Sequence, residues 1–345
     1  MHQLPVVFMF SGQGSHYNRM GESLYRTNSV FRYWMDELDK VCIAAADFSV
    51  VDVLYAHNSQ FKQDFCRTLH THTALFMVQY SLFQVIINTG IKPDRVIGTS
   101  LGEFVSAAVA GVCDVNKLLR DIINQAKFIE KNCPDGAMIS VLAESNKYKQ
   151  ISQLQCNSEL VAINSDNNFV IATEAASVKY ITSYLKDEGI VFQVLQVSHG
   201  FHSSAIDMAQ KSYLESVSKR QFKFPVVKYV SSMHGWELSK FEPEYFWNVV
   251  RKPICFKQAV KFIDNSEKCV YIDLGPSGTL AGFVKKILSD NLTERVYSVM
   301  SPFFDDEKQL TRVHAQLLSS PSKLITKKRT KMKSYVFPGQ GSQFV

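Results

Sequence analysis

The residue of this sequence best suited to covalent chemistry is Ser100, at the centre of the pentapeptide Gly98–Gly102 (Gly-Thr-Ser-Leu-Gly). Apolar, β-branched residues precede the pentapeptide and small residues follow it, so the pattern predicts a strand, a sharp turn and a helix. Such a sharp turn places the serine hydroxyl at the surface. It requires glycines, because residues without a Cβ let the strand and helix cross closely. The spacing alone also fits a structural turn, and the context favours a nucleophile.

A serine nucleophile needs a base, and two histidines follow a predicted strand at residues 191–197. His199 and His202 lie in the segment Ser198–Ser203 (Ser-His-Gly-Phe-His-Ser). A neutral imidazole can accept the serine proton near neutral pH. The residues alone leave open which histidine is the base and which is structural.

A glycine-rich loop follows the first predicted strand, Val6–Phe10. Its sequence over Ser11–Ser15 is Ser-Gly-Gln-Gly-Ser. Open α/β sheets place their sites at the carboxyl ends of strands, so we expect backbone amides of this loop to face a pocket. A plain tight turn would contain the same residues.

The elements that must position these residues alternate between strands and helices. Helices are predicted over 21–42 and over the apolar run 73–87, which leads through a break to the strand before Ser100. This alternation favours a parallel sheet covered on both faces. Residues 137–197 follow the order β-α-β-β-α-β, which is typical of a ferredoxin-like unit. The sheet pattern resumes after His202, with strands at 226–230 and 270–274.

We therefore predict a large α/β subdomain (1–134 and 199–302), an inserted small subdomain (135–198) and an interdomain linker (303–333). The last residues, 334–345, repeat the beginning of the chain, since Phe337–Ser342 (Phe-Pro-Gly-Gln-Gly-Ser) matches Phe10–Ser15 (Phe-Ser-Gly-Gln-Gly-Ser) at every position but one. This internal repeat predicts the start of a second, tandem copy of the domain.

Composition excludes several classes of protein. The net charge of +6 arises from 38 basic and 32 acidic residues, and six basic residues without an acid lie between 320 and 333. The excess thus belongs to one segment, which favours a solvated linker over nucleic-acid binding. Seven scattered cysteines without a C-x-x-C pair indicate neither disulfides nor a metal site. We expect no membrane span, no secretory signal and a cytoplasmic location.

Together, four motifs in order resemble the acyltransferase domains of polyketide and fatty acid synthases, the malonyl transferase family. They are Phe-x-Gly-Gln-Gly-Ser, Gly-x-Ser-Leu-Gly-Glu, His-x-Phe-His-Ser and Asp-Leu-Gly-Pro-Ser-Gly-Thr-Leu, spread over about residues 5 to 300. The resemblance implies an α/β-hydrolase-like core with a parallel sheet and a ferredoxin-like insert. It implies Ser100 as the acylated nucleophile, His202 as its base, and the amides of Gln13 and Leu101 as the oxyanion hole. A main-chain carbonyl near Asn248 or Val249 is expected to orient the histidine.

The sequence departs from this family at the acyl pocket. Malonyl-transferring members carry an arginine 25 residues after the nucleophile to bind the substrate carboxylate, and here the position is Gln125. Lys127 lies two positions on, and on a helix it would face elsewhere. Thr99 stands where the family usually has histidine, and His72 is in place of glutamine. Together with two residues of the histidine motif, these complete the expected substrate-binding set, Gln125, His199, Phe201, Thr99 and His72.

The missing arginine resembles a branch of acyl hydrolases in synthases whose acyltransferases act in trans. We therefore expect hydrolysis of acyl thioesters on acyl carrier protein, with neither a metal nor a cofactor beyond the phosphopantetheine that carries the acyl group. The expected partners are carrier proteins of a polyketide synthase assembly line and the tandem acyltransferase domain. An acyltransferase that loads malonyl or another acyl unit is the alternative, and an inactive carrier-docking module is a third.

Overall fold

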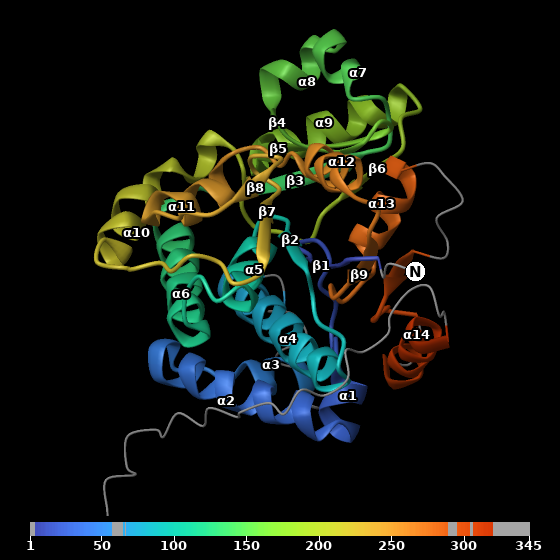
Figure 1. The fold of residues 1–345 in the computed structure, drawn as a ribbon. Helices are drawn as coiled ribbons and strands as arrows, with labels where there is room; N and C mark the ends of the chain where they lie inside the picture. The colour runs from blue at the N-terminus through green and yellow to red at the C-terminus, as the bar shows by residue number, and fades with distance from the viewer. Residues whose placement is uncertain (1–3, 57–64, 66, 289–294, 304–305, 320–345) are drawn as a thin grey trace, which may run out of the picture.

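The structure is a computed structural model that describes residues 4–56, 65, 67–288, 295–303 and 306–319. Two sheets organise the described residues, one of six strands and one of four. Figure 1 shows the smaller sheet with its helices at the top of the molecule and the larger sheet below it. The predicted α/β class with two subdomains is confirmed.

The six-stranded sheet is parallel except at one edge. Its order is β10 (Val296–Ser298), β9 (Val270–Asp273), β1 (Val6–Phe10), β2 (Arg95–Gly98), β7 (Lys228–Ser231) and β8 (Glu237–Leu238). Every neighbouring pair is parallel except β7 and β8. Strand β1 is wholly buried and lies next to β2, which leads to Ser100. The carboxyl ends of β1 and β2 therefore meet at one edge of the sheet.

Helices cover both faces of this sheet, and successive strand residues point to opposite faces. Phe8 and Phe10 pack into the core shared with α4 (Thr68–Asn88), α5 (Gly102–Val109), α6 (Val115–Asn132) and α11 (Pro243–Arg251). Val7 and Met9 pack into a second core with α12 (Phe256–Ser266) and α13 (Thr279–Leu288). Other helices of the large subdomain are α1 (Glu22–Thr27), α2 (Ser29–Ala46), α3 (Val50–Tyr55), the short 3-10 helix η2 (Ser204–Ala209) and α10 (Gln210–Val217).

Two predicted helical regions differ in their bounds from the helices of the structure. The buried helix expected over 73–87 is confirmed as α4, which begins earlier and is buried on nearly all sides. The helical structure expected over 21–42 is also found, but it forms two helices, α1 and α2, with a break at Asn28. The Asn28 side chain accepts hydrogen bonds from the amides of Val30 and Phe31, at 3.1 and 3.0 Å, and so begins a new helix.

The four-stranded sheet is antiparallel, in the order β4 (Glu159–Ser165), β5 (Asn168–Glu174), β3 (Gly136–Val141) and β6 (Phe192–Val194). On one face, Ile139 and Phe169 pack against α8 (Ser152–Asn157) and α9 (Ala175–Asp187), with α7 (Asn146–Gln150) preceding them. Residues of the other face, such as Met138 and Val170, join the core of the large subdomain. The strand order and the two helical connections confirm the ferredoxin-like unit.

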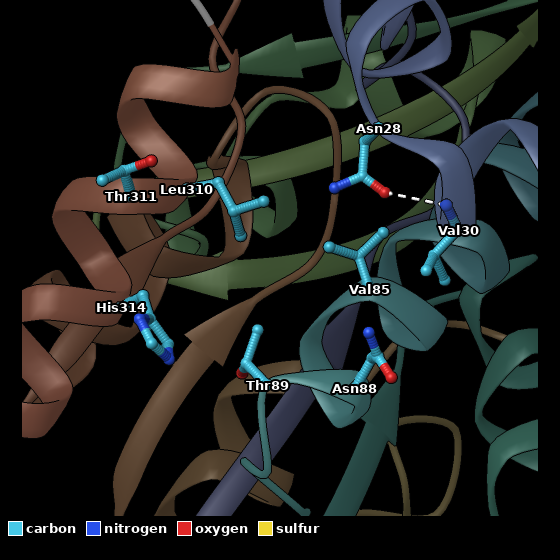
Figure 2. Close-up of a pocket in the computed structure, with 8 residues that line it drawn as sticks. All are labelled: Asn28, Val30, Val85, Asn88, Thr89, Leu310, Thr311 and His314. Atoms are coloured by element: carbon cyan, nitrogen blue, oxygen red, sulfur yellow. Dashed lines mark hydrogen bonds between the residues drawn. The ribbon is translucent and has the colours of Figure 1, made fainter.

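The chain after residue 302 differs from the prediction. Residues expected to begin the linker instead form α14 (Asp306–Ser319), which lies beside α1 (Figure 1). A pocket of about 220 Å³ lies between Leu310 and His314 of α14, the start of α2 and the end of α4 (Figure 2). The rest of the predicted linker and the predicted second copy, 334–345, lie outside the described residues.

No helix in the described ranges is long and apolar enough to cross a membrane.

Candidate active site

The turn that carries Ser100 is as tight as its glycines suggest. Strand β2 ends at Gly98 and α5 begins at Gly102. A Cβ at Gly98 would lie 2.2 Å from the carbonyl carbon of Gly102, and one at Gly102 would lie 2.0 Å from the carbonyl oxygen of Phe10. Ser100 itself has φ +52°, a left-handed conformation that costs a serine of order 1 kcal/mol or more. The predicted strand-turn-helix context is confirmed.

His202 is hydrogen-bonded to this serine. Its Nε2 lies 2.8 Å from Ser100 Oγ, and its Nδ1 lies 2.8 Å from the carbonyl oxygen of Lys252. Because a carbonyl can only accept, the proton is on Nδ1, and Nε2 presents its lone pair to the serine hydroxyl. This is the arrangement of a general base beside a nucleophile.

The end of α11 fixes the backbone and ring of this histidine. The last carbonyls of a helix have no partner within it. Here the Val250 carbonyl accepts the His202 amide at 2.8 Å, and that of Lys252 accepts Nδ1–H. A main-chain carbonyl orients the histidine as expected, but it belongs to Lys252, three residues beyond Val249. The Asn248 carbonyl accepts the Lys252 amide at 2.7 Å within the final helical turn, so a free carbonyl first comes later in the chain.

Burial keeps His202 neutral. The side chain is 2% exposed, and the loss of hydration lowers its pKa from 6.5 to about 4. The Lys252 carbonyl opposes this change, and the charge of Arg251 adds to it. At neutral pH the imidazole is therefore able to accept a proton.

The loop after β1 lies directly against the serine turn. The Gly12 amide donates to Thr99 Oγ1 at 3.2 Å, and a Cβ at Gly12 would lie 2.9 Å from Ser100 Cβ. Thr99, predicted to bind substrate, therefore has its hydroxyl engaged in joining the two loops. In the described part of the chain, the amides of Gln13 and Leu101 donate to no protein acceptor. Both amides belong to the loops that flank Ser100.

Three predicted substrate-binding residues form one buried cluster next to His202. The Phe201 ring contacts two imidazoles, with ring centroids 5.2 Å from that of His72 and 6.2 Å from that of His199. His199 Nδ1 is also within hydrogen-bonding distance of Ser198 Oγ, at 3.1 Å, and of Thr68 Oγ1, at 3.3 Å. Burial lowers the pKa of His72 to about 3 and that of His199 below its usual range. The cluster is therefore uncharged at neutral pH.

Gln125 lies in the interior of α6 and is fully buried. Its Nε2 donates to the Phe246 carbonyl of α11 at 3.2 Å, and its Oε1 has no hydrogen-bond partner in the described residues. Lys127 is exposed and donates from Nζ to the Ala45 carbonyl at 2.7 Å. As expected, Lys127 does not take the place of the missing arginine.

Glu103, the last residue of the Gly-x-Ser-Leu-Gly-Glu motif, has a structural role that the sequence did not predict. The fully buried carboxyl accepts hydrogen bonds from the Ser232 amide at 2.6 Å, from Ser232 Oγ at 2.9 Å, and from Tyr245 Oη at 3.1 Å. Tyr229 also donates to it. Burial raises the pKa of Glu103 to about 7, which these donors partly oppose. Glu103 thus binds the start of α5 to the end of β7, beneath the serine turn.

Within the described residues, no group of three or more His, Cys, Asp or Glu side chains is placed to hold a metal ion. A cavity of about 610 Å³ lies between the β7–β8 turn and the end of α11. Lys252 lines this cavity, so the segment that orients His202 forms part of its wall.

A serine paired with a buried histidine at the carboxyl edge of a parallel sheet, with the histidine oriented by a carbonyl, defines a serine enzyme suited to acyl transfer. The chain belongs to the acyl transferase domain family, whose model matches residues 7–319.

Relatives and solved structures agree with this assignment. The chain is 41% identical to the polyketide biosynthesis acyltransferase homolog PksD of Bacillus subtilis, over 90% of this chain and 95% of that protein. It is 38% identical to the homolog BaeD of Bacillus velezensis, over 92% and 98%. The acyltransferase domain from the second module of the salinomycin polyketide synthase has a TM-score of 0.81 and 26% identity, over 93% of this chain and 74% of that one. The chain is therefore an acyltransferase domain of polyketide biosynthesis.

Proposed function

We propose that this chain is an acyl hydrolase that removes acyl groups from the phosphopantetheine thiol of acyl carrier protein. The observation that carries the proposal is Gln125, a buried neutral amide at the position where malonyl-transferring members have arginine. A free carboxylate entering this region would lose its hydration without gaining a cation from α6. Such desolvation costs several kcal/mol, so neutral acyl groups are favoured over malonyl.

The first half of the reaction acylates the serine. His202 Nε2 takes the proton of Ser100 Oγ, and the oxygen attacks the thioester carbonyl carbon. The amides of Gln13 and Leu101 donate to the resulting oxyanion, each such donor contributing roughly 3 kcal/mol. As the intermediate collapses, the carbon–sulfur bond breaks and His202 returns the proton to the departing thiol.

The second half releases the acid. Water takes the place of the thiol, His202 Nε2 accepts one of its protons, and the oxygen attacks the acyl-serine carbonyl carbon. Collapse of this intermediate breaks the bond to Ser100 Oγ, which regains the proton from the imidazolium. The free acid and the original dyad remain, and Nδ1–H stays bonded to Lys252 throughout.

The alternative is an acyltransferase that passes malonyl or another acyl unit from CoA to a carrier protein. PksD and BaeD, whose names call them acyltransferase homologs, favour this alternative. It uses the same dyad and differs only in the acyl group and in the final acceptor.

The setting we propose is a cytoplasmic polyketide synthase whose carrier proteins are the partners, with a tandem acyltransferase domain in the same chain. One relative supports such an arrangement. The chain is 33% identical to the polyketide biosynthesis protein ThaF of Burkholderia thailandensis over 97% of its own length, but over only 30% of that longer protein.

The experiment that tests the proposal compares acetyl-loaded and malonyl-loaded carrier protein in the absence of any acceptor. The expected result is release of acetate faster than malonate, with an equal amount of free carrier thiol. Mass spectrometry of the acyl-enzyme formed from a mixture of both donors should find mainly acetyl-Ser100. Ser100→Ala supplies the baseline, since it removes the nucleophile.

A substitution makes the acyl preference testable. Gln125→Arg should move the acyl-serine population towards malonyl by about tenfold or more, because a buried guanidinium can pair with the carboxylate. Lys127→Gln is the matched control on the same helix and should leave the preference unchanged. Rapid malonyl transfer to a second carrier protein, with slow release to water, would refute hydrolysis. If a folded Gln125→Arg variant keeps the same acyl preference, Gln125 does not determine the choice of acyl group.

A further inference from the structure

Strand β4 is the edge strand of the small sheet, and its free edge contacts the large subdomain. Ala162 forms a parallel bridge with Ile254, and the Ile254 amide donates to the Val161 carbonyl at 2.8 Å. An edge strand has unpaired backbone groups that need a partner. Here the partner is the segment that begins with Lys252, the residue whose carbonyl orients His202.

The beginning of β4 is hydrogen-bonded to the chain segment that follows His202. Glu159 Oε1 accepts a hydrogen bond from the Ser204 amide at 2.9 Å and another from the Ser204 hydroxyl. Ser204 begins η2, two residues after His202. Strand β4 is thus hydrogen-bonded to both chain segments that meet at the catalytic base.

An ion pair connects these two segments directly. Arg251 donates to Asp207 of η2 from Nε and from Nη2, the latter at 3.1 Å. Arg251 immediately precedes Lys252. The hydrogen bond to Asp207 raises the pKa of Arg251, and the charges of Asp207 and Glu159 add to this effect. We call Glu159, Ser204, Asp207 and Arg251 the Glu159 cluster.

His202 needs such support because its backbone is unfavourable. Its φ of +65° lies in the left-handed region, which a residue with a side chain keeps only when its surroundings hold it. The bond from Nε2 to Ser100 Oγ requires the ring to stay within a few tenths of an ångström of its position. A displacement of about 1 Å can slow such a reaction by roughly a hundredfold.

We propose that Glu159 is a positioning residue for the reaction, through which strand β4 of the small subdomain holds His202 in line with Ser100. This inference rests on His202 as the base of Ser100, which is part of the proposed function, and not on whether water or a thiol accepts the acyl group. Through Glu159, the alignment of His202 with Ser100 depends on the contact between the two subdomains.

The test measures acylation of Ser100 in a single turnover with p-nitrophenyl acetate, following release of p-nitrophenolate. Glu159→Ala removes the acceptor of both Ser204 hydrogen bonds, and we expect the maximal acylation rate to fall about tenfold with an unchanged half-saturating concentration. Glu159→Gln keeps an oxygen acceptor and should retain the rate within about threefold. Glu144→Ala removes an exposed acid elsewhere in the small subdomain and should behave as the unsubstituted protein. The midpoints of thermal unfolding should agree within a few degrees.

Two results would overturn the proposal. One is a Glu159→Ala protein that acylates at the unsubstituted rate. The other is an equal loss in Glu159→Ala and Glu159→Gln that parallels a loss of thermal stability, since that indicates only a structural role. Failure of the proposed hydrolysis has a different signature, because Ser100 would then acylate normally while the acyl-enzyme resisted water.

Discussion

Acidification provides a quantitative test of the environment of His202. The base must be neutral to accept the serine proton, and burial lowers its pKa from 6.5 to about 4. At pH 5 about 0.9 of the imidazole is then neutral, whereas about 0.03 would be neutral at an unperturbed pKa. We therefore expect kcat/KM to remain nearly constant between pH 7 and pH 5, and at pH 5 to be about thirtyfold above the value that an ordinary histidine would give.

The assay is release of carrier thiol from acetyl-loaded carrier protein between pH 4 and 8. Since kcat/KM reports the pKa values of the free enzyme, its acidic decline gives the pKa of His202. Circular dichroism at each pH establishes that the protein is still folded, and Ser100→Ala gives the background. A decline centred near pH 6.5 in folded protein would refute the assignment of a buried, neutral base.

The same pKa affects stability, with a definite sign. The unfolded chain binds the proton of this histidine more tightly than the folded protein, because the folded pKa is the lower one. The stability associated with His202 is thus complete above pH 6.5 and is lost as the pH falls towards 4. The total loss is about 3 kcal/mol. Folding must therefore be followed alongside activity at the acidic end.

Two further predictions concern the serine turn. Gly102→Ala should destabilise the protein by about 3 kcal/mol, because the added methyl would lie 2.0 Å from the Phe10 carbonyl, whereas Gly282→Ala in α13 meets nothing within 4 Å and should be neutral or slightly stabilising. Urea unfolding measures both, and similar effects would contradict the steric argument. Glu103→Gln should alter the pH dependence of stability. The folded pKa of Glu103 is raised to about 7, so its contribution is greatest below pH 4.5 and declines up to pH 7. The stability of the unsubstituted protein relative to Glu103→Gln should fall by roughly 3 kcal/mol over this range. A constant difference would show that the carboxyl does not titrate there.

The sequence was most informative where the structure depends on neighbours in the chain. The turn at Ser100 could be predicted from Gly98 and Gly102, because these glycines allow β2 and α5, which are adjacent in the chain, to cross closely. The ferredoxin-like order was also readable, since each strand and helix has its own hydrophobic pattern. By contrast, the choice of His202 over His199 came only from the resemblance. The two histidines differ in their distant partners, Ser100 and Lys252 for one and Thr68 for the other.

Features that depend on distant segments were wrongly predicted or not anticipated. The orienting carbonyl was misplaced because the exact end of α11 decides which carbonyl is free, and helix ends are poorly specified by pattern. Helix α14 lies in the predicted linker because little apolar pattern follows Pro302, yet its Leu310 and Val313 are buried in the core of the large subdomain. The bond from Glu159 to Ser204 joins exposed polar residues 45 positions apart, and no local signal predicts it.

The alignment of the dyad and the choice of acyl group have separate structural origins. His202 is held by the carbonyls of Val250 and Lys252 at the end of α11 and, through Ser204, by strand β4. Gln125 lies inside α6 and donates to the carbonyl of Phe246, nearer the middle of α11. Substitutions at distant sites without shared partners usually have additive effects. A Glu159→Ala change should therefore slow acetyl and malonyl acylation by the same factor, and Gln125→Arg should change their ratio without moving the acidic decline of kcat/KM. If the double variant instead shows strong coupling in the acyl preference, the small subdomain also shapes the acyl pocket.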